Sequence, residues 1–380
     1  MRIVFDVDDT ISVHENRDYA NAKPKKDVIR KLNYMHDVLG YEIALHTSRG
    51  MLSCDGNIEI AESKNRCTLE KWLKENDVHY DEIIFGKPFA DLYVDDRCIN
   101  LDDFMKYEFC ELKGGSGKKV SRLGNIVKKE TTHEKVNKIK NWTNKSKGIC
   151  KSPKIISSVY DSVYMEYING TVACNVDDYR ILKLVVKQLK QKIEAFSNIK
   201  VGNSKFNVDK HVNVLLKNTE DNNFWLNERI RKCIAKLYEN KEELNLHCSF
   251  CHGDLILSNI IIGENDGELY FIDPEMDEEA SSYLLDLAKL RMSLMGYENI
   301  FGLSDVANFS FNYKSEILKS FDNEMKEKGI YDLVILLNYM YVLRLWRYKP
   351  ENQKYMVKQM IIELEEENEQ FRSRDPKNLD

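Results

Sequence analysis

Two aspartates at the end of an apolar segment are the first residues whose types and spacing could do chemistry. Asp6 and Asp8 follow the segment 2–5, which has the composition of a β-strand. Ligands of open α/β sheets bind at the carboxyl ends of the strands, so both carboxylates are expected in one crevice. One could attack a phosphoryl group while the other protonates the leaving oxygen. A capped turn would have the same local sequence, so this pair alone is a weak signal.

Three further groups each follow an expected strand, and they strengthen the first pair. They are Thr47, Lys87, and Asp95 with Asp96. A hydroxyl group, a cation and a carboxylate would then stand at neighbouring strand ends around one crevice. Mg²⁺ there would screen the repulsion between carboxylate and phosphate. The choice between Thr47 and Ser48 stays open, as does the choice between Asp95 and Asp96.

A second set combines a base, an amide and another carboxylate. Asp254 and Asn259 lie in one loop, and Asp273 follows fourteen residues after Asn259. In phosphoryl transfer, an aspartate orients the acceptor hydroxyl while an asparagine and a second aspartate hold Mg²⁺ on the ATP phosphates. Two strands joined by a turn would bring Asn259 close to Asp273. Glu275 is either a further metal-site carboxylate or a solvated turn residue.

The elements that must position these residues differ between the two parts of the chain. The first 110 residues alternate strand and helix patterns, which predicts a mainly parallel sheet with helices on both faces. The expected strands are 2–5, 41–46, 82–85 and 91–94, and the expected helices are 25–39 and 68–76. The intervals between the motifs are too short for a separate cap domain. Helices dominate from residue 177, and the apolar stretch Tyr331–Trp346 is expected to be a buried helix.

Length, charge and cysteine usage limit the class of protein. A chain of 380 residues is expected to hold two domains. A net charge of −6 argues against a dedicated nucleic-acid binder, and we interpret the lysine-rich stretch 118–154 as solvated surface. Nine cysteines without a disulfide framework, and no signal peptide, predict a cytoplasmic protein. No stretch predicts a membrane span, and Cys248 and Cys251 lack the second pair that a zinc site needs.

The first set resembles the haloacid dehalogenase (HAD) superfamily over about residues 1–110. This resemblance implies an α/β Rossmann-like phosphatase domain in which Asp6 forms an aspartyl-phosphate and Asp8 is the general acid/base. The remaining roles it implies are phosphate binding by Thr47 and Lys87, and Mg²⁺ binding by Asp6, the carbonyl of Asp8, and Asp95 or Asp96. Local sequence also resembles the capless phosphatases found among bacterial surface-polysaccharide proteins.

The second set resembles the aminoglycoside phosphotransferase and choline kinase group. Over residues 112–380 the resemblance implies an α+β protein-kinase-like domain. Its expected parts are a small β-rich N-lobe at about 112–170, a mostly helical C-lobe at about 171–360, and a polar tail to 380. Asp254 would be the catalytic base, Asn259 and Asp273 would bind Mg²⁺, and His252 would be structural.

The ATP site implied by this resemblance lies upstream of the catalytic loop. Its expected residues are Gly115, Ser116, Lys128, Glu166 and Tyr167. The Gly/Ser tract could cover the phosphates or be a linker between domains. Lys128 is favoured as the ATP lysine, but strand alternation does not exclude Lys129, and Glu134 is a candidate partner on the next helix. Glu166 and Tyr167 would belong to the hinge strand that holds adenine.

Together these patterns predict a bifunctional Mg²⁺-dependent enzyme. It would phosphorylate a sugar or polyol hydroxyl with ATP and hydrolyse a phosphomonoester on the same metabolite, in surface or capsular polysaccharide precursor synthesis. The alternatives are a choline- or ethanolamine-type kinase with a phosphatase, one silent regulatory or binding module, and nucleic-acid end processing. The missing Walker sequence and the acidic charge count against the last. The expected partners are ATP, a phosphorylated metabolite and a small alcohol, with no nucleic acid or membrane, and the oligomeric state is left open.

Overall fold

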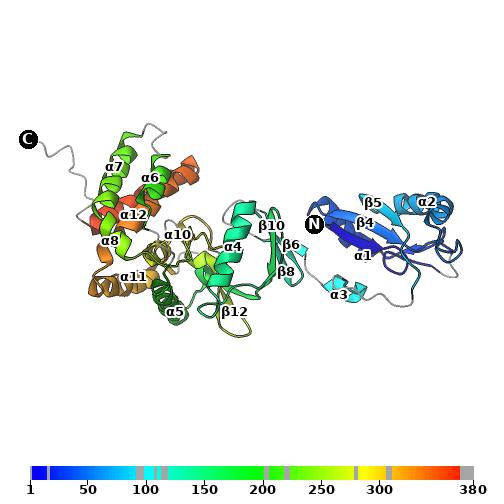
Figure 1. The fold of residues 1–380 in the computed structure, drawn as a ribbon, viewed down its shortest axis with the longest axis horizontal. Helices are drawn as coiled ribbons and strands as arrows, with labels where there is room; N and C mark the ends of the chain where they lie inside the picture. Colours follow the sequence, from blue (N-terminus) through cyan, green and yellow to red (C-terminus); the bar gives the residue numbers. More distant parts are fainter. Residues whose placement is uncertain are drawn as a thin grey trace, which may run out of the picture. The chain divides into compact units, whose positions relative to one another are not determined.

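The computed structural model describes most of the chain, which forms two compact units (Figure 1). The described residues are 2–14, 18–90, 98–106, 109–112, 119–200, 205–217, 223–277, 281–304 and 310–368. The units are Met1–Lys128 and Lys129–Asp380, so their boundary falls within β8 (Ile126–Glu130). The predicted domain limit between residues 110 and 112 stays a prediction.

A three-stranded parallel sheet forms the centre of the first unit. Its strands, in spatial order, are β1 (Arg2–Asp6), β4 (Glu42–Thr47) and β5 (Glu82–Phe85). Their register places Asp6 beside His46 and Thr47 beside Phe85, so the three carboxyl ends meet at one edge. The parallel arrangement expected from the strand–helix alternation is therefore present, while the predicted strand 91–94 lies outside the described residues. The Rossmann-like HAD fold itself stays a prediction.

Two long helices connect these strands. The first, α1 (Lys26–Asp37), buries an apolar face made by Val28, Ile29, Leu32 and Met35. The second, α2 (Ile58–Glu75), begins ten residues before the predicted start at Thr68. Its early start follows from Asn57, whose side chain accepts a hydrogen bond from the N–H of Ile60 and caps the first turn. The first half of α2 is mostly solvated, so hydrophobic periodicity gave no signal there.

The other elements of the first unit are short. They are the antiparallel pair β2 (Ser12–Val13) and β3 (Lys23–Pro24), helix α3 (Leu101–Lys106), and the antiparallel pair β6 (Phe109–Leu112) and β7 (Val120–Leu123). Among the described residues, the interval between β1 and β4 holds only β2, β3 and α1, and the interval between β4 and β5 holds only α2. These intervals therefore contain no separate cap domain in the part of the chain that the structure describes.

The second unit opens with a small part that combines one helix with three strands. Its elements are α4 (His133–Lys145), β9 (Ile155–Val159), β10 (Ser162–Glu166) and β11 (Gly170–Val172). Strands β9 and β10 form an antiparallel hairpin. Strand β11 pairs with β12 (Ile260–Gly263), which pairs with β13 (Leu269–Phe271), again antiparallel. The last two strands are the pair predicted around the metal-site residues.

Helices make up the rest of the second unit, as the two-lobe prediction requires. They are α5 (Tyr179–Ser197), α6 (Val208–Leu216), α7 (Phe224–Glu239), α8 (Lys241–Leu246), α9 (Tyr283–Leu294), α10 (Tyr297–Ile300), α11 (Ser310–Glu327), α12 (Tyr331–Tyr348) and α13 (Glu351–Glu367). Helix α12 packs against α6, α7, α9, α11 and α13, which confirms the predicted buried helix. No helix in the described ranges is long and apolar enough to cross a bilayer.

The polar tail expected after about residue 360 is still helical in its first residues, because α13 continues to Glu367. Glu365 is buried, accepts a hydrogen bond from the Tyr339 hydroxyl at 2.7 Å, and forms an ion pair with Arg229 at 2.9 Å. Glu367 forms an ion pair with Arg291 at 2.7 Å. These partners hold α13 in helical form to Glu367, although its sequence there is a run of acidic residues.

Candidate active sites

The carboxyl edge of the parallel sheet brings two predicted residues of the first site together. Asp6 ends β1, and its Oδ2 lies 3.0 Å from Lys87 Nζ. Lys87 follows Gly86, which turns the chain with a φ of 99°, and the Lys87 N–H donates to the Thr47 carbonyl at 3.2 Å. Partial burial raises the pKa of Asp6, while the Lys87 ammonium opposes that rise. A carboxylate and a cation are thus placed side by side where a phosphoryl group could bind.

Asp8 is held by Arg49, which the sequence motifs did not assign. Arg49 Nε lies 3.0 Å from each Asp8 carboxylate oxygen, and Nη2 lies 2.7 Å from Oδ1. The Arg49 side chain is almost completely buried, and its guanidinium stands 4.5 Å from the centre of the Tyr19 ring. Ser12 Oγ and His14 Nε2 also approach Asp8 Oδ1, at 3.4 Å and 3.8 Å. These contacts fix the orientation of the Asp8 carboxylate.

The remaining residues of the first site are only partly placed. Thr47 is completely buried, and its Oγ1 accepts a hydrogen bond from the Arg49 N–H at 3.1 Å. Ser48 is partly exposed, and the choice between the two hydroxyls stays a prediction. Asp95 and Asp96 lie outside the described residues, so their predicted role as metal ligands stays a prediction too.

In the second unit, Asp254 is held from two directions. Asn259 Nδ2 donates to the Asp254 carbonyl at 2.9 Å and to its Oδ2 at 3.0 Å. Lys289 Nζ lies 2.9 Å from Oδ1 and 4.2 Å from the centre of the Tyr341 ring. Both carboxylate oxygens of Asp254 therefore have a fixed partner. Lys289 was missed by the sequence motifs, although it lies three residues after Asp286 and hence on the same side of α9.

The start of the loop that carries Asp254 is held by a buried carboxylate on α9. Asp286 accepts hydrogen bonds from the N–H groups of His252 at 2.6 Å and Gly253 at 2.8 Å. Burial raises the pKa of Asp286 to about 7, while the two N–H groups favour its charged form. Gly253 has a φ of 85°, and a Cβ there would come within 2.7 Å of the Glu275 carbonyl carbon. Burial lowers the pKa of His252 to about 4, which fits a structural residue rather than a proton carrier.

Side chains from α4 and α9 hold the rest of the loop by hydrogen bonds. Trp142 on α4 donates its Nε1–H to the Cys251 carbonyl at 2.9 Å. At the other end, Ser293 Oγ accepts from the Leu257 N–H at 3.0 Å. The Ser293 hydroxyl donates in turn to a buried glutamate, Glu298, at 2.6 Å. Hydrogen bonds at both ends therefore hold the loop in place, and such preorganisation would suit a base.

Asp273 lies two residues after the end of β13, with a φ of 58°. Its Oδ1 is 2.5 Å from Lys129 Nζ and 3.1 Å from Lys135 Nζ. The N–H of Ile272 donates to the Asn259 carbonyl at 3.0 Å, which joins the two predicted metal-site segments. Burial acts to raise the pKa of Asp273, but the two ammonium groups outweigh burial and lower it. Asp273 is therefore an ionised carboxylate surrounded by positive charge.

The geometry distinguishes Lys129 from Lys128, which the sequence favoured as the ATP lysine. Lys129 forms the ion pair with Asp273, and successive side chains of a strand point to opposite faces. The choice of ATP lysine stays a prediction. The candidate partner Glu134 is exposed and pairs with Lys138 on its own helix at 2.9 Å. Lys135, its neighbour on α4, reaches the site instead and also pairs with Glu275.

The other predicted ATP contacts are less complete. Gly115 and Ser116 lie outside the described residues. Glu166 ends β10, and its N–H donates to the Lys154 carbonyl at 2.9 Å. That N–H is therefore used within the protein, and a hinge contact to adenine would use other backbone groups at Glu166 and Tyr167. Both assignments stay predictions.

The donor atoms of both sites fit Mg²⁺, which prefers oxygen ligands. In the second unit, the side-chain nitrogen of Asn259 donates to Asp254, so the Asn259 side-chain oxygen, Oδ1, is the atom that could bind a metal ion. Asp273 supplies an ionised carboxylate. In the first unit, Asp6 and the carbonyl of Asp8 supply oxygen atoms at the end of β1.

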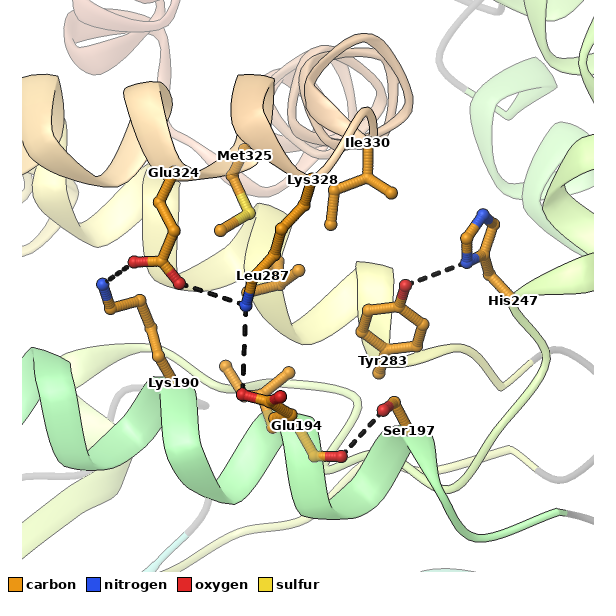
Figure 2. A pocket seen from close by; sticks show the side chains of 11 residues that line it. Lys190, Glu194, Ser197, His247, Tyr283, Leu287, Glu324, Met325, Lys328 and Ile330 are labelled. Atoms are coloured by element: carbon orange, nitrogen blue, oxygen red, sulfur yellow. Dashed lines mark hydrogen bonds and ion pairs between the residues drawn. The ribbon is translucent and has the colours of Figure 1, made fainter.

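A cavity of about 250 Å³ lies elsewhere in the second unit, between α5, α9 and α11 (Figure 2). Its charged residues pair with each other: Glu324 accepts from Lys190 and lies 3.1 Å from Lys328. The Tyr283 hydroxyl and His247 Nδ1 are 2.9 Å apart. The lining includes none of the residues around Asp254 or Asp273, so we assign no part of phosphoryl transfer to this cavity.

No model of a protein family and no curated protein matches the chain. Among solved structures, a structural-genomics target from Vibrio cholerae is 33% identical, with 28% of this chain and 89% of that chain covered and a TM-score of 0.27. A GDP complex of aminoglycoside 2′-phosphotransferase IIIa is 15% identical, with coverage of 72% and 95% and a TM-score of 0.48. A choline/ethanolamine kinase family protein from Mesorhizobium loti is 15% identical, with coverage of 68% and 87% and a TM-score of 0.44. All three TM-scores are below 0.5, so the proposal below rests on the side-chain geometry.

Proposed function

We propose that the second unit is an ATP-dependent phosphotransferase that acts on a hydroxyl group of a small molecule. The observation that carries the proposal is the arrangement of Asp254, Asn259 and Asp273. Asn259 bonds to Asp254 through its side chain and to the residue before Asp273 through its carbonyl. A base and two metal ligands are thereby linked within one rigid loop and strand pair, as in-line phosphoryl transfer requires.

In this mechanism Asp254 orients the acceptor hydroxyl and receives its proton. The hydroxyl oxygen forms a bond to the γ-phosphorus of ATP while the bond from that phosphorus to the β-phosphate oxygen breaks, which releases ADP. Lys129 and Lys135 place positive charge beside the phosphates, and Lys289 keeps the Asp254 carboxylate in position. Mg²⁺ bound by Asn259 and Asp273 would neutralise charge on the phosphates.

For the first unit we infer phosphomonoester hydrolysis, on the strength of two ion pairs. The Asp6 carboxylate would attack phosphorus beside the Lys87 ammonium, and the leaving alcohol would take a proton from Asp8. Water would then attack the aspartyl-phosphate, return a proton to Asp8 and release orthophosphate. Arg49, which contacts both Asp8 oxygens, would keep that carboxylate in place during both proton transfers. Mg²⁺ at Asp6 and the Asp8 carbonyl would reduce the repulsion between carboxylate and phosphate.

The two activities would cancel if they acted on one position. We therefore propose that they relocate phosphate on one metabolite, by adding it at one hydroxyl and removing it from another. A sugar or polyol of the kind used in surface-polysaccharide precursors fits this scheme, and an amino alcohol such as choline or ethanolamine is the second candidate for the kinase.

A product-resolved ³¹P NMR screen tests this proposal. The full chain would be mixed with Mg²⁺, ATP and a panel of sugars, polyols, amino alcohols and their phosphates. The expected result is a new phosphoester together with ADP, and orthophosphate from a phosphorylated panel member. The kinase proposal would be contradicted if ATP yielded only ADP and orthophosphate, and if no panel member changed the rate at which ATP is consumed.

A further inference from the structure

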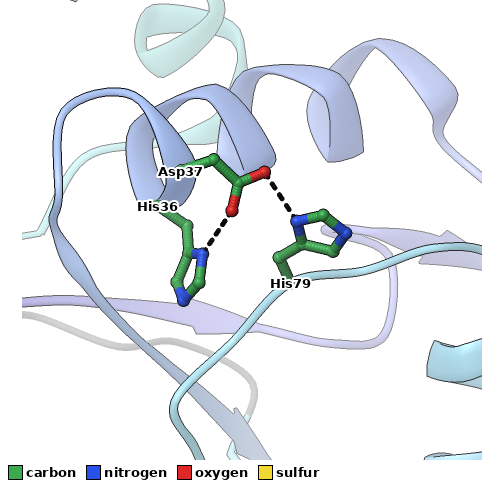
Figure 3. A group of neighbouring side chains, drawn as sticks. All are labelled: His36, Asp37 and His79. Atoms are coloured by element: carbon green, nitrogen blue, oxygen red, sulfur yellow. Dashed lines mark hydrogen bonds and ion pairs between the residues drawn. The ribbon is translucent and has the colours of Figure 1, made fainter.

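Three side chains that commonly bind metals meet at the amino edge of the sheet in the first unit (Figure 3). His36 and Asp37 end α1, and His79 lies in the loop before β5. Asp37 bridges the two rings, with His36 Nδ1 2.6 Å from Oδ1 and His79 Nδ1 2.7 Å from Oδ2. The candidate ligand atoms all lie within 4.8 Å of one another. Asp6, Thr47 and Lys87, in contrast, lie at the carboxyl edge of the same sheet.

The second nitrogen of each ring also has a carboxylate beside it. His79 Nε2 lies 3.2 Å from Asp77 Oδ1, and His36 Nε2 lies 3.7 Å from Asp81 Oδ1. Histidines that bind a metal through one nitrogen usually donate the other N–H to a carboxylate or carbonyl, which fixes the tautomer and the ring orientation. Asp77 and Asp81 are in the positions of such outer carboxylates. A cluster of surface ion pairs would not need them, so their presence favours a metal site.

The backbone that carries these side chains is already fixed. Asn33 on α1 accepts a hydrogen bond from the His79 N–H at 2.9 Å and donates to the Asp77 carbonyl at 2.6 Å. Asp81 exchanges two hydrogen bonds with Ile43 at the start of β4, at 2.7 Å and 2.9 Å. The loop is thus bound to both α1 and β4. The carboxyl end of α1 also carries a partial negative charge that favours a cation.

We propose that His36, Asp37 and His79 bind a divalent transition-metal ion of the zinc class. The ion would replace the protons that the two rings now share with the Asp37 carboxylate. Ligands about 2.0–2.1 Å from a tetrahedral ion stand about 3.3 Å apart. The two hydrogen-bonded pairs would need to separate by well under 1 Å, and candidate ligand atoms that lie up to 4.8 Å apart would need to approach one another by up to about 1.5 Å. Imidazole ligands favour zinc, nickel or copper over Mg²⁺, so this site differs in kind from the proposed catalytic metal sites. The bound ion would clip the end of α1 to the loop before β5.

The test is a Zn²⁺ titration of the full chain after chelator treatment, with a competing zinc-sensitive dye and excess Mg²⁺ present. The wild-type protein is expected to bind one equivalent more than the double variant H36Q/H79Q. The matched control is H133Q, which removes an exposed histidine that stacks on Tyr160 in the second unit and should bind like wild type. D77N should weaken the zinc affinity by about tenfold, as loss of an outer carboxylate does.

Thermal unfolding supplies a second readout that does not depend on stoichiometry. Zn²⁺ should raise the melting temperature of wild type and H133Q but not that of H36Q/H79Q, because a ligand stabilises only the state that binds it. D37N, which keeps the side-chain shape, provides the same comparison if the double variant does not fold. The proposal is overturned if wild type binds no zinc at micromolar concentration, or if D37N and H36Q/H79Q bind it as wild type does.

Discussion

Lys289 offers the sharpest test of the geometry around Asp254. The substitution K289M keeps the length of the side chain and its packing on Tyr341 but removes the ammonium 2.9 Å from Asp254 Oδ1. Two unit charges at that distance interact by about 6 kcal/mol at an effective dielectric constant of about 20. Desolvation of both groups offsets most of this, which leaves about 1.5–3 kcal/mol, the usual range for a hydrogen bond to a charged group.

This energy holds Asp254 in the orientation needed for transfer, so its loss should appear in turnover. We expect K289M to lower kcat for ADP formation by about ten- to a hundredfold. The KM for ATP should change little, because Lys289 bonds to the base and is assigned no nucleotide contact. The assay is coupled ADP detection with the acceptor found in the NMR screen.

K289R is the matched variant, because it keeps the charge and should recover part of the lost turnover. Urea unfolding of the three proteins shows whether each is folded under assay conditions. A folded K289M with kcat within twofold of wild type would refute the reasoning. So would a variant whose whole defect lies in the KM for ATP.

Four further substitutions have defined outcomes. D286N should lower the free energy of unfolding of the second unit by about 1–3 kcal/mol in urea titrations, because an amide cannot accept from both N–H groups of the catalytic loop. K129M should lower kcat/KM for ATP by about tenfold or more, whereas K128M should have the smaller effect, since Lys129 is the residue paired with Asp273. R49K should lower phosphatase turnover and spare ADP formation, because lysine cannot reproduce the guanidinium contact with both Asp8 oxygens.

Matched substitutions at exposed positions separate these effects from general damage. D177N and R30K make the same chemical changes on solvated residues and should leave stability and both activities near wild type. Stability of D286N equal to that of D177N would contradict its assigned role. A larger loss with K128M than with K129M would reverse the lysine assignment, and full phosphatase activity of R49K would remove Arg49 from the site.

Much of the fold follows from local pattern. The three described strands of the parallel sheet and the buried helix α12 were predictable because apolar residues recur there in runs longer than a turn. The first half of α2 was missed because it is polar and solvated, so that its start depends on the Asn57 cap. The helical end of α13 was missed because Glu365 is stabilised by Arg229 and Tyr339, which are distant in sequence.

The site divides in the same way. The grouping of Asp254, Asn259 and Asp273 in the fold was predictable from their spacing along one loop and strand pair, whereas their roles stay predictions. Arg49 and Lys289 were not, because each is defined by a carboxylate 41 or 35 residues away that only the folded chain brings near.

To choose between Lys128 and Lys129, one must know which of the two side chains lies on the face of β8 toward Asp273. Alternation shows that neighbouring side chains face opposite ways, but it does not say which of them faces Asp273. The ion pair between Lys129 and Asp273 shows that the Lys129 side chain lies on that face.

The central claim is that two separate sites handle phosphate in this chain, and one comparison tests it most directly. D6N and D254N would be followed by ³¹P NMR with ATP, the acceptor and the phosphomonoester in a single mixture. We expect D6N to form ADP and the new phosphoester but to release no orthophosphate. We expect the reverse for D254N, and each loss should be of several orders of magnitude. Loss of both activities in either folded variant, or ADP formation by D254N at the wild-type rate, would contradict it.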